Sequence, residues 1–346
     1  MSMQRAIVEH GHLLNLAVRL PVPGKVLVHV GQTINYGDLI AEAVLPAKFQ
    51  VFDVVNQFRI KERDLEGCIK RLAGESVQKG DVIARKPGLI SRIFRAPEAG
   101  KVVAVRDGRV TLAMGEKNIQ SYSPISGTVA DLIPGFGAQV VARGTSLQAA
   151  WGNGKFAMGN LTIVEKLDQS ASDILKDKIV FLTGSPGIPE LRILQDAQVA
   201  GVVFPSLDPR LFSACKTWKI PLISLVGFGE AQTDTVSRNT LEKMNEKQVF
   251  LLGHFPNAAE GIRPELFLPD PGNQTAELFE ATQLELVGNQ VRLLGSPYFG
   301  SQGRIIEVSE NEERLGSGLL SNVVVVKRDD EKLIHVPLEN LEILSR

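Results

Sequence analysis

The sequence offers few side chains whose types and spacing could do chemistry, and they do not form a catalytic set. His10 and His12 have the period-two spacing that places two ring nitrogens on one face of a strand. No Cys, Asp or Glu group with metal-ligand spacing accompanies them. Cys68 and Cys215 lie far apart without a neighbouring histidine, which argues against a thiol nucleophile. We therefore expect no catalytic residues, no metal site and no cofactor.

The glycine-rich loop at residues 184–189 is the other candidate for chemistry. A phosphate cradle needs successive backbone N–H donors, and Pro186 and Pro189 remove two of them. The sequence contains neither a G-x-G-x-x-G nor a G-x-x-x-x-G-K-[ST] motif, so nucleotide binding is not favoured. Whether the surrounding domain holds another small molecule stays open.

The net charge conceals an uneven distribution. The 346 residues suggest two or three domains, and 38 Lys and Arg stand against 39 Asp and Glu. Residues 1–160 carry 20 basic and 13 acidic residues, whereas residues 161–283 carry 11 and 16, and residues 284–346 carry 7 and 10. These charges are typical of solvated faces, or of domains that dock on each other, or of a basic partner-facing surface. Only two cysteines, no amino-terminal leader pattern and no long apolar stretch lead us to expect a cytoplasmic protein.

Two short patterns each occur twice in the first half of the chain. A G-x-x-[IV]-x-x-G-D-x-I-A pattern fills residues 31–41 and again residues 74–84. An [AS]-P-x-[AS]-G-x-V pattern fills residues 96–102 and again residues 123–129. Gly-Asp supplies a tight turn before a strand, and Gly in the second pattern permits close backbone approach. These units predict a small, curled β structure.

The same units resemble the half-motifs of biotinyl/lipoyl-like barrel-sandwich hybrid domains. The resemblance covers residues 24–164 and implies a barrel-sandwich hybrid within a first domain of residues 1–165. Such domains also occur in RNA polymerase large subunits and in redox-pump subunits, without a carrier role. Carrier domains hold a modified lysine between particular flanking residues, which neither Lys48 nor Lys101 has. Whether either lysine is ever modified stays open.

A helical insert is expected between the Gly-Asp units, at residues 50–73. Apolar residues recur with helical spacing at residues 51–58 and again at residues 64–72. The insert either covers one end of the barrel or forms a DNA-reading helix-turn-helix, and the acidic start of its second helix favours the former. The candidate contact residues of its basic surface are Arg59, Lys61, Arg63, Lys70 and Arg71.

Strands and helices alternate from residue 166 to residue 283. Buried strands are expected at residues 178–183, 201–205 and 220–226, with helices between them, and this alternation predicts a small α/β domain with a parallel sheet. We expect a further helix near residues 241–252. Any ligand of such a sheet binds beyond the carboxyl ends of its strands.

The C-terminal residues 284–346 contain the most specific pattern. A strand, a Pro-Tyr-Phe-Gly turn and a second Gly at residues 290–306 resemble the KOW motif of ribosomal proteins and transcription elongation factors. The resemblance implies a five-stranded β-barrel with Tyr298 and Phe299 at its exposed turn. KOW modules often contact RNA or a polymerase, but the negative charge here favours docking to a protein partner or to the chain's own other domains, and Tyr298 and Phe299 either take part in such a contact or pack the mouth of the barrel.

The sequence therefore predicts a multidomain, mainly β protein with an α/β part. We expect a non-enzymatic interaction or scaffold protein associated with the transcription or translation machinery, with a protein partner and no membrane. The alternatives are a nucleic-acid-binding protein that uses the basic N-terminal domain, and an accessory subunit of an enzyme or carrier with a small-molecule site in the α/β domain. The identity of the partner and the oligomeric state stay open.

Overall fold

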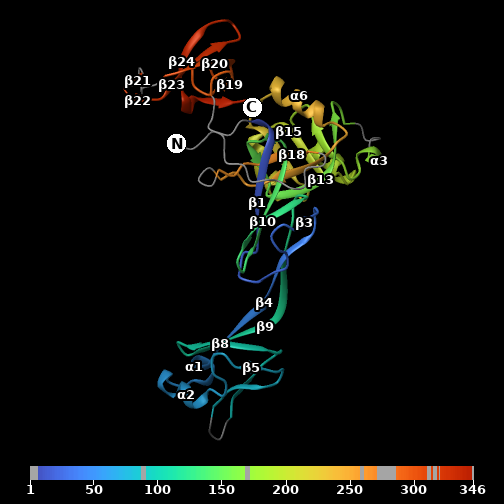
Figure 1. The fold of residues 1–346 in the computed structure, drawn as a ribbon. Coiled ribbons are helices and arrows are strands. Elements are labelled where there is room, and N and C mark those ends of the chain that lie inside the picture. The colour runs from blue at the N-terminus through green and yellow to red at the C-terminus, as the bar shows by residue number, and fades with distance from the viewer. Residues whose placement is uncertain are drawn as a thin grey trace.

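The protein is elongated, with a small unit held away from a larger body by two long strands (Figure 1). The computed structural model describes residues 7–86, 91–167, 172–257, 261–270, 286–309, 313–314, 318 and 320–344. Strands hold 51% of the residues and helices 15%, so the expectation of a multidomain, mainly β protein is confirmed at that level. Among the helices in these ranges, none combines the length and apolar character that crossing a bilayer requires.

An eleven-stranded sheet runs through the body, and β11 (Gly137–Gln148) connects its parts. One edge of β11 pairs along its whole length with β1 (Val8–Arg19). The other edge pairs first with β10 (Gly127–Ile133) and then with β18 (Glu265–Pro269). β11 therefore joins the first part of the chain to the α/β part in one hydrogen-bonded sheet.

Four parallel strands form the centre of the α/β part. They are β13 (Lys155–Val164), β14 (Ile179–Leu182), β15 (Gly201–Leu207) and β16 (Leu222–Phe228). The short β12 (Trp151–Gly152) pairs with β16 at one edge of the sheet. Every residue of β14 and β15 is buried, as continuous apolar runs in a parallel sheet predict.

Helices cover both faces of these strands. They are α3 (Ser172–Leu175), α4 (Ile188–Asp196), α5 (Phe212–Thr217) and α6 (Thr235–Met244). Leu241 and Met244 of α6 pack on one face of the sheet, and Leu191 and Leu194 of α4 pack on the other. The parallel sheet expected from the alternation of strands and helices is confirmed.

Two details of the α/β part differ from expectation. The helix expected at residues 241–252 is wrong, because α6 ends at Met244 and residues Gln248–Gly253 form the strand β17. Buried apolar residues fill both stretches, and periodicity does not separate a short buried strand from a helix. β13, which we assigned to the first domain, lies in this sheet between β14 and β17.

The first part of the chain contains two similar β units, one inserted into the other. The proximal unit (residues 8–45 and 117–148) includes β1, β2 (Lys25–Val26), β3 (Thr33–Ile34), β10 and β11. The distal unit (residues 46–116) includes β5 (Ser76–Val77), β6 (Val82–Arg85), β7 (Ile93–Arg95) and β8 (Gly100–Arg106). The strands β4 (Leu39–Asp53) and β9 (Arg109–Tyr122) pass through both units. The distal unit has its own apolar core, whereas the core of the proximal unit also includes Phe250, Leu252 and Phe267 of the α/β part.

The Gly-Asp turns of the two units make the same hydrogen bonds. In the proximal unit the backbone N–H of Asn35 donates to Oδ2 of Asp38 at 2.8 Å. In the distal unit the N–H of Gln78 donates to Oδ2 of Asp81 at 3.0 Å. The aspartate of each Gly-Asp pair therefore has a structural role: its carboxylate accepts a hydrogen bond from the residue three positions earlier and so closes the turn.

Each turn is also tied to the second repeated pattern. The N–H of Gly37 donates to the carbonyl of Ser123 at 2.8 Å, and the N–H of Gly80 donates to the carbonyl of Ala96 at 2.7 Å. The two sequence repeats therefore encode two halves of one structural unit. In the proximal unit those halves are separated by the whole distal unit.

One glycine in each unit is fixed by a close contact with a neighbouring strand. A Cβ at Gly127 would lie 2.2 Å from the carbonyl oxygen of Val141, and a Cβ at Gly100 would lie 2.2 Å from that of Ala113. Both distances are far shorter than any contact between a carbon and an oxygen that are not bonded to each other. Only glycine allows the strand to cross its neighbour at this point.

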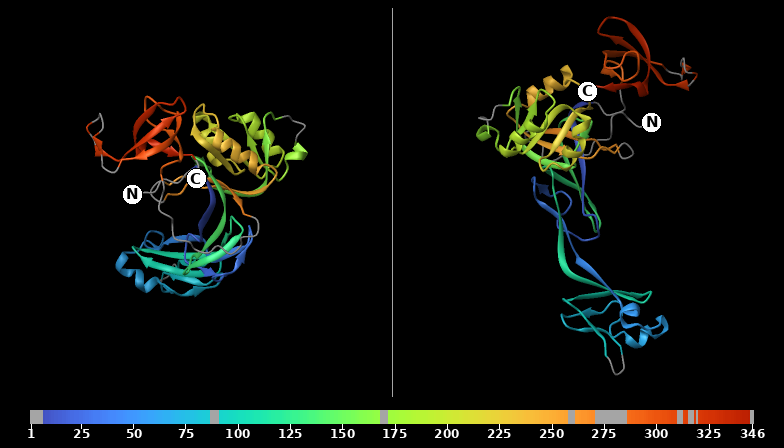
Figure 2. Two further views of the ribbon diagram at one scale, coloured as in Figure 1. Left: turned by 45° about the horizontal axis from the view of Figure 1, so that its top comes forward. Right: turned by 180° about the vertical axis from the view of Figure 1, so that it is seen from behind.

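The connection between the two units is a two-stranded ribbon. β4 pairs with β9 from Leu39 to Asp53, and no residue of β4 from Val44 to Val51 is buried. We call residues 44–47 and 115–118 the neck. The right view of Figure 2 shows the distal unit joined to the body through this narrow connection. Because only two strands pass through the neck, the distal unit stands clear of the body.

The expected helical insert is shorter than the sequence pattern suggests. β4 continues to Asp53, whose side chain caps α1 (Val54–Phe58), and after a 3₁₀ turn at Glu62–Asp64 comes α2 (Leu65–Cys68). Both helices pack on the core of the distal unit. At five and four residues they are too short to read a DNA groove in the helix-turn-helix manner.

The C-terminal part is an antiparallel sheet of five strands around its own core. Its strands, in sheet order, are β24 (Leu333–Pro337), β23 (Val323–Arg328), β20 (Gln302–Val308), β19 (Gln290–Leu293) and β25 (Leu341–Ile343). A small hairpin of β21 (Glu313–Arg314) and β22 (Leu320–Ser321) lies beside them, and a 3₁₀ turn at Leu338–Asn340 precedes β25.

Ion pairs dock this sheet on the body. Arg292 of β19 donates to Oε2 of Glu342 at 2.5 Å, and its guanidinium lies 3.7 Å from Asp234, the capping residue of α6. These side chains are largely removed from solvent. The N–H of Val8 also donates to the carbonyl of Leu344 at 2.9 Å, so the end of the chain extends toward β1.

The close approach at Gly100 gives a first prediction. We expect Gly100→Ala to destabilise the distal unit by about 1–3 kcal/mol, because the new methyl group forces β8 away from β9. Native-state hydrogen exchange of the distal amides measures this loss. Gly67→Ala is the matched control, since a Cβ there meets nothing within 4 Å, and it should not destabilise the unit. Equal exchange in the two variants would contradict the assignment.

Candidate functional site

The two histidines that could share a strand face are separated by an irregularity of β1. Gly11 has a left-handed backbone with φ of 63°, and the pairing with β11 shifts between Glu9 and His12. His12 Nδ1 lies 2.8 Å from Glu9 Oε2, while His10 Nδ1 lies 3.3 Å from Thr145 Oγ1. Within the described ranges, no three His, Cys, Asp or Glu side chains gather as metal ligands would.

Both cysteines are buried and unbridged. Cys215 of α5 packs in the core between the helix and the parallel sheet. Burial raises the pKa of its thiol to about 11. The thiolate, which is the nucleophilic form, is therefore scarce at neutral pH.

The two lysines considered as modification sites lie on the strands of the distal unit. Lys48 of β4 forms an ion pair with Glu98 at 2.8 Å, and both side chains are about half exposed. Lys101 is exposed on β8, opposite Ser76 of β5. Neither lysine lies at the tip of a hairpin, which is the position that a carrier lysine needs.

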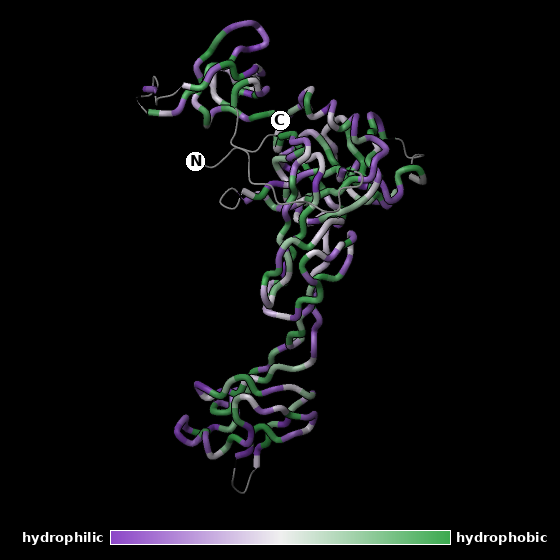
Figure 3. The backbone as a smooth tube through the Cα atoms, in the orientation of Figure 1, coloured by the Kyte–Doolittle hydropathy of each residue, from purple (hydrophilic) through white to green (hydrophobic). Residues whose placement is uncertain are grey.

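The five basic candidates of the distal unit lie around its two helices, on a side that Figure 3 shows as largely hydrophilic. Arg59 ends α1 in a left-handed conformation, and Lys61 precedes the 3₁₀ turn that contains Arg63. Lys70 and Arg71 follow α2. All five therefore belong to one helical corner of the unit.

Part of this basic charge is neutralised locally. Arg71 lies 3.2 Å from Asp81 and 3.5 Å from Glu75, and Arg63 lies 3.9 Å from Asp64. The unit nevertheless keeps an excess, with 14 basic and 9 acidic residues between positions 46 and 116.

Tyr298 and Phe299, at the turn before β20, have different surroundings. The guanidinium of Arg328 lies 4.9 Å from the centre of the Tyr298 ring, a cation–π contact within the sheet. Phe299 is 76% exposed. Tyr298 is 37% exposed, so both rings reach the surface and Phe299 offers the larger exposed area to a partner.

The loops beyond the parallel strands carry hydroxyls and aromatic rings instead of a phosphate cradle. Ser206 Oγ lies 2.7 Å from Ser185 Oγ and accepts from the N–H of Ala231, so its hydroxyl ties the end of β15 to two loops. Phe212 and Phe228 contact each other at 5.6 Å between ring centroids. These groups stabilise the loops and leave two partly exposed rings beside them.

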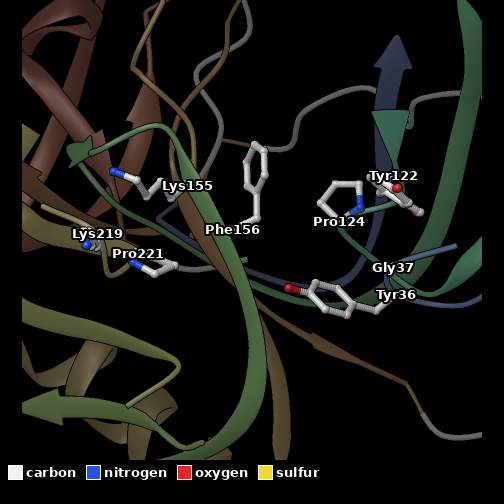
Figure 4. A pocket seen from close by; sticks show the side chains of 9 residues that line it. Tyr36, Gly37, Tyr122, Pro124, Lys155, Phe156, Lys219 and Pro221 are labelled. Carbon is white, nitrogen blue, oxygen red and sulfur yellow. The ribbon is translucent and has the colours of Figure 1, made fainter. Parts of the chain in front are cut away.

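A pocket of about 450 Å³ lies where the proximal unit meets the α/β part. Figure 4 shows Tyr36 and Tyr122 on the side of the proximal unit, with Phe156, Lys155 and Lys219 across from them. Burial raises the pKa of Tyr36, and Lys155 donates to the carbonyl of Trp218. The pocket is therefore lined by aromatic rings and by the amines of Lys155 and Lys219, and the amine of Lys155 already donates a hydrogen bond within the protein.

Next to Phe156, on or beside the strands of the α/β part and on β11, lie several buried or half-buried polar side chains. The ring of His254 contacts Phe156 at 4.8 Å, and burial lowers the pKa of His254, an effect that Glu265 partly offsets. Ser146 donates to the buried carboxylate of Glu265. The amide of Gln148, on the neighbouring position of β11, is buried without a hydrogen-bond partner among the described residues. Such a group costs stability, and nothing in the described contacts compensates for it.

Sequence analysis did not identify the pocket, although the repeats contain the necessary information. When the two units are aligned by their Gly-Asp turns and paired strands, Tyr36 takes the place of Lys79 and Tyr122 takes the place of Arg95. The proximal unit has tyrosines where it contacts the α/β part. The distal unit has basic residues on the equivalent face, which has no such contact.

The comparisons with known proteins give no family for this chain: no family model matches it, and no curated protein matches it.

The buried thiol gives a second prediction. In a Cys68→Ala variant, we expect native Cys215 to react slowly with a disulfide reagent at pH 8 and faster as the pH approaches 11, where its thiolate forms. Because the pKa of about 11 lies above that of an unfolded cysteine, the stability contributed by Cys215 is present below pH 9 and lost toward pH 11.

Reaction kinetics across this pH range measure the first effect, and thermal unfolding measures the second. A Cys215→Ser variant is the control for both. Rapid reaction of the native chain at pH 8, at the rate of the unfolded chain, would contradict the assignment.

Proposed function

We propose that this protein is a non-enzymatic interaction or scaffold protein that presents its distal unit to a protein partner. The observation that carries the proposal is the neck, through which only β4 and β9 connect the distal unit to the body. A unit held in this way exposes nearly its whole surface. Its position favours contact with another molecule over a role in the stability of the body.

We further propose that both units are barrel-sandwich hybrids and that the C-terminal sheet is a KOW-like barrel. The matched turns at Asp38 and Asp81 support the first assignment. The five-stranded sheet with the exposed turn at Phe299 supports the second. Both resemblances are found among proteins of transcription and translation, and we therefore place the partner among those machineries.

A deletion of the distal unit tests the proposed function. Ala47 and Gly115 lie opposite each other in the neck, so replacing residues 48–114 with Asn-Gly joins β4 and β9 through a four-residue loop, Ala47-Asn-Gly-Gly115, next to the pair of Pro46 and Glu116. We expect full-length protein to capture a partner from its native host and the deletion variant to lose that partner. Quantitative mass spectrometry of the captured proteins, with and without nuclease, provides the measurement.

A Leu333→Ser variant is the control, because it changes an exposed side chain in the C-terminal sheet that has no assigned contact role and leaves the neck intact. Equal capture by the full-length and deletion proteins would contradict the proposal. Loss of capture after nuclease treatment would favour nucleic acid as the partner.

Nucleic-acid binding is a second candidate, favoured by one feature of the distal unit. Lys79 and Arg95 occupy the face that is aromatic in the proximal unit, and the whole unit has a net charge of +5 from 14 basic and 9 acidic residues. Arg95 Nη1 donates to the carbonyl of Gly80 at 2.9 Å, which holds its guanidinium beside the turn. An anion with repeating phosphates fits such a surface.

The salt dependence of binding tests this candidate. If the distal unit contacts several phosphates, the affinity for a single-stranded RNA should fall steeply between about 50 and 200 mM salt, by roughly a hundredfold or more. Fluorescence anisotropy measures it. A Lys79→Gln, Arg95→Gln variant should flatten the dependence, whereas Lys332→Gln in the C-terminal sheet should not. A flat response of the unchanged protein would remove the candidate.

A further inference from the structure

The far half of β4 has a strand neighbour on one edge only. β9 pairs with β4 along its whole length, whereas β2 pairs with it only at Ala41 and Glu42. In the part of the chain that the structure describes, no strand covers the other edge of β4 beyond these residues. The distal unit therefore has an open strand edge at residues 47–52, just beyond the neck.

Hydrogen bonds across the distal sheet show which way the backbone of β9 turns. The N–H of Val102 donates to the carbonyl of Glu75 at 2.9 Å, and its own carbonyl accepts from Gly74 at 2.7 Å, so Val102 faces β5. Leu112 of β9 lies opposite Val102. Because alternate residues of a middle strand bond to opposite neighbours, Leu112 turns its backbone groups toward β4.

The same alternation continues into β4. Gln50 is the partner of Leu112, and it therefore bonds to β9. Phe49 and Val51, on either side of it, direct their N–H and C=O groups to the open edge. The N–H of Val54, four positions after Gln50, donates to the carbonyl of Gly108 at 3.0 Å. Val54 thus bonds toward β9 as Gln50 does, which agrees with the assignment of Phe49 and Val51 to the open edge.

The side chains on this edge are large, apolar and exposed. Phe49 is 62% exposed and Val51 is 55% exposed, and both lie on one face of β4. Lys48, a residue type that often protects open edges, instead forms an ion pair with Glu98 at 2.8 Å. The edge therefore combines free backbone groups with an apolar surface.

The proximal unit shows that the fold does not require these residues. Its β1 pairs with β11 as β4 pairs with β9, and by this register Asn15 is equivalent to Phe49 and Ala17 to Val51. The proximal edge is thus polar or small where the distal edge is aromatic and branched. Exposed apolar residues that only one copy carries indicate a contact specific to that copy.

Charge decides which occupant fits the edge. The distal unit has 14 basic and 9 acidic residues, so pairing its edge with that of a second copy would bring two positively charged units together. An extended segment with acidic side chains has the complementary charge. Apolar side chains at alternate positions of such a segment would cover Phe49 and Val51.

We propose that the edge of β4 at residues 47–52 binds an acidic, extended peptide segment of a partner protein, which adds to the distal sheet as a further strand. This inference rests on the proposed function and names the site and the chemistry of the partner. Backbone hydrogen bonds supply the affinity, and the apolar and acidic side chains supply the selectivity.

A displayed library of random seven-residue peptides, selected on the immobilised full-length protein, tests the proposal. We expect enriched peptides to alternate apolar residues with Asp or Glu. The dissociation constant of a synthetic enriched peptide is then measured by fluorescence anisotropy. Val51→Pro removes one free edge N–H and should weaken binding about tenfold, whereas Val51→Thr keeps the N–H and the branched shape and should change it less than about threefold.

A second variant keeps the test decisive if Val51→Pro disturbs the fold. Phe49→Asn gives the distal edge the residue that the proximal unit has at the equivalent position, Asn15, so the fold tolerates it. This variant should also weaken peptide binding about tenfold. Circular dichroism and hydrogen exchange of the distal amides verify folding.

Several results would overturn the inference. They are a selection that enriches no peptide, enriched peptides without acidic residues, equal binding by all variants, and concentration-dependent dimerisation that Val51→Pro abolishes. If these variants keep the partner that the deletion of residues 48–114 loses, the inference fails and the proposed function stands. If the deletion also keeps the partner, the proposed function fails.

Discussion

The antiparallel pairing of β4 with β9 is the contact on which the arrangement of the protein depends. At one end the two strands belong to the core of the proximal unit, and at the other they belong to the core of the distal unit. Between the cores, at the neck, no residue of either strand is buried, so the ribbon is held there without a core of its own. A two-stranded ribbon is marginally stable by itself, so the packed units at both ends must fix its register.

Charge has different uses in the two halves of the protein. In the body some of it joins parts of the structure, as Arg292 illustrates by linking the C-terminal sheet to Asp234 at the start of α6. In the distal unit the positive charge is only partly neutralised, and it accumulates where the surface is most open. The nearly neutral whole chain therefore conceals a basic extremity on a more acidic body.

The sequence predicts well which kinds of secondary structure the chain forms. It predicts poorly that one β unit is inserted into the other. The Gly-Asp repeats and the alternation from residue 166 indicate the curled β units and the parallel sheet, because both depend on local turn chemistry and burial. The nesting depends on the pairing of β4 with β9, which lie far apart in the sequence. Val51 also has helical spacing with Val54 and Phe58, so the pattern of the helix conceals the end of the strand and, with it, the exposed edge at Phe49. Of the candidate residues, the sequence locates the basic corner and the turn at Phe299, whereas the pocket requires the folded contact between units.

The matched registers of the two units also suggest how such a chain is built. In the distal unit β6 pairs with β7 through Val82 and Arg95, with the same one-residue irregularity that follows the pairing of Leu39 with Tyr122. The distal unit therefore occupies the place where its own copy has an ordinary β6–β7 hairpin. A duplicated segment inserted at a hairpin tip enters and leaves through adjacent strands, and the host core needs no change. Because β6 and β7 are again adjacent, paired strands, the distal unit offers a position of the same kind for a further inserted segment.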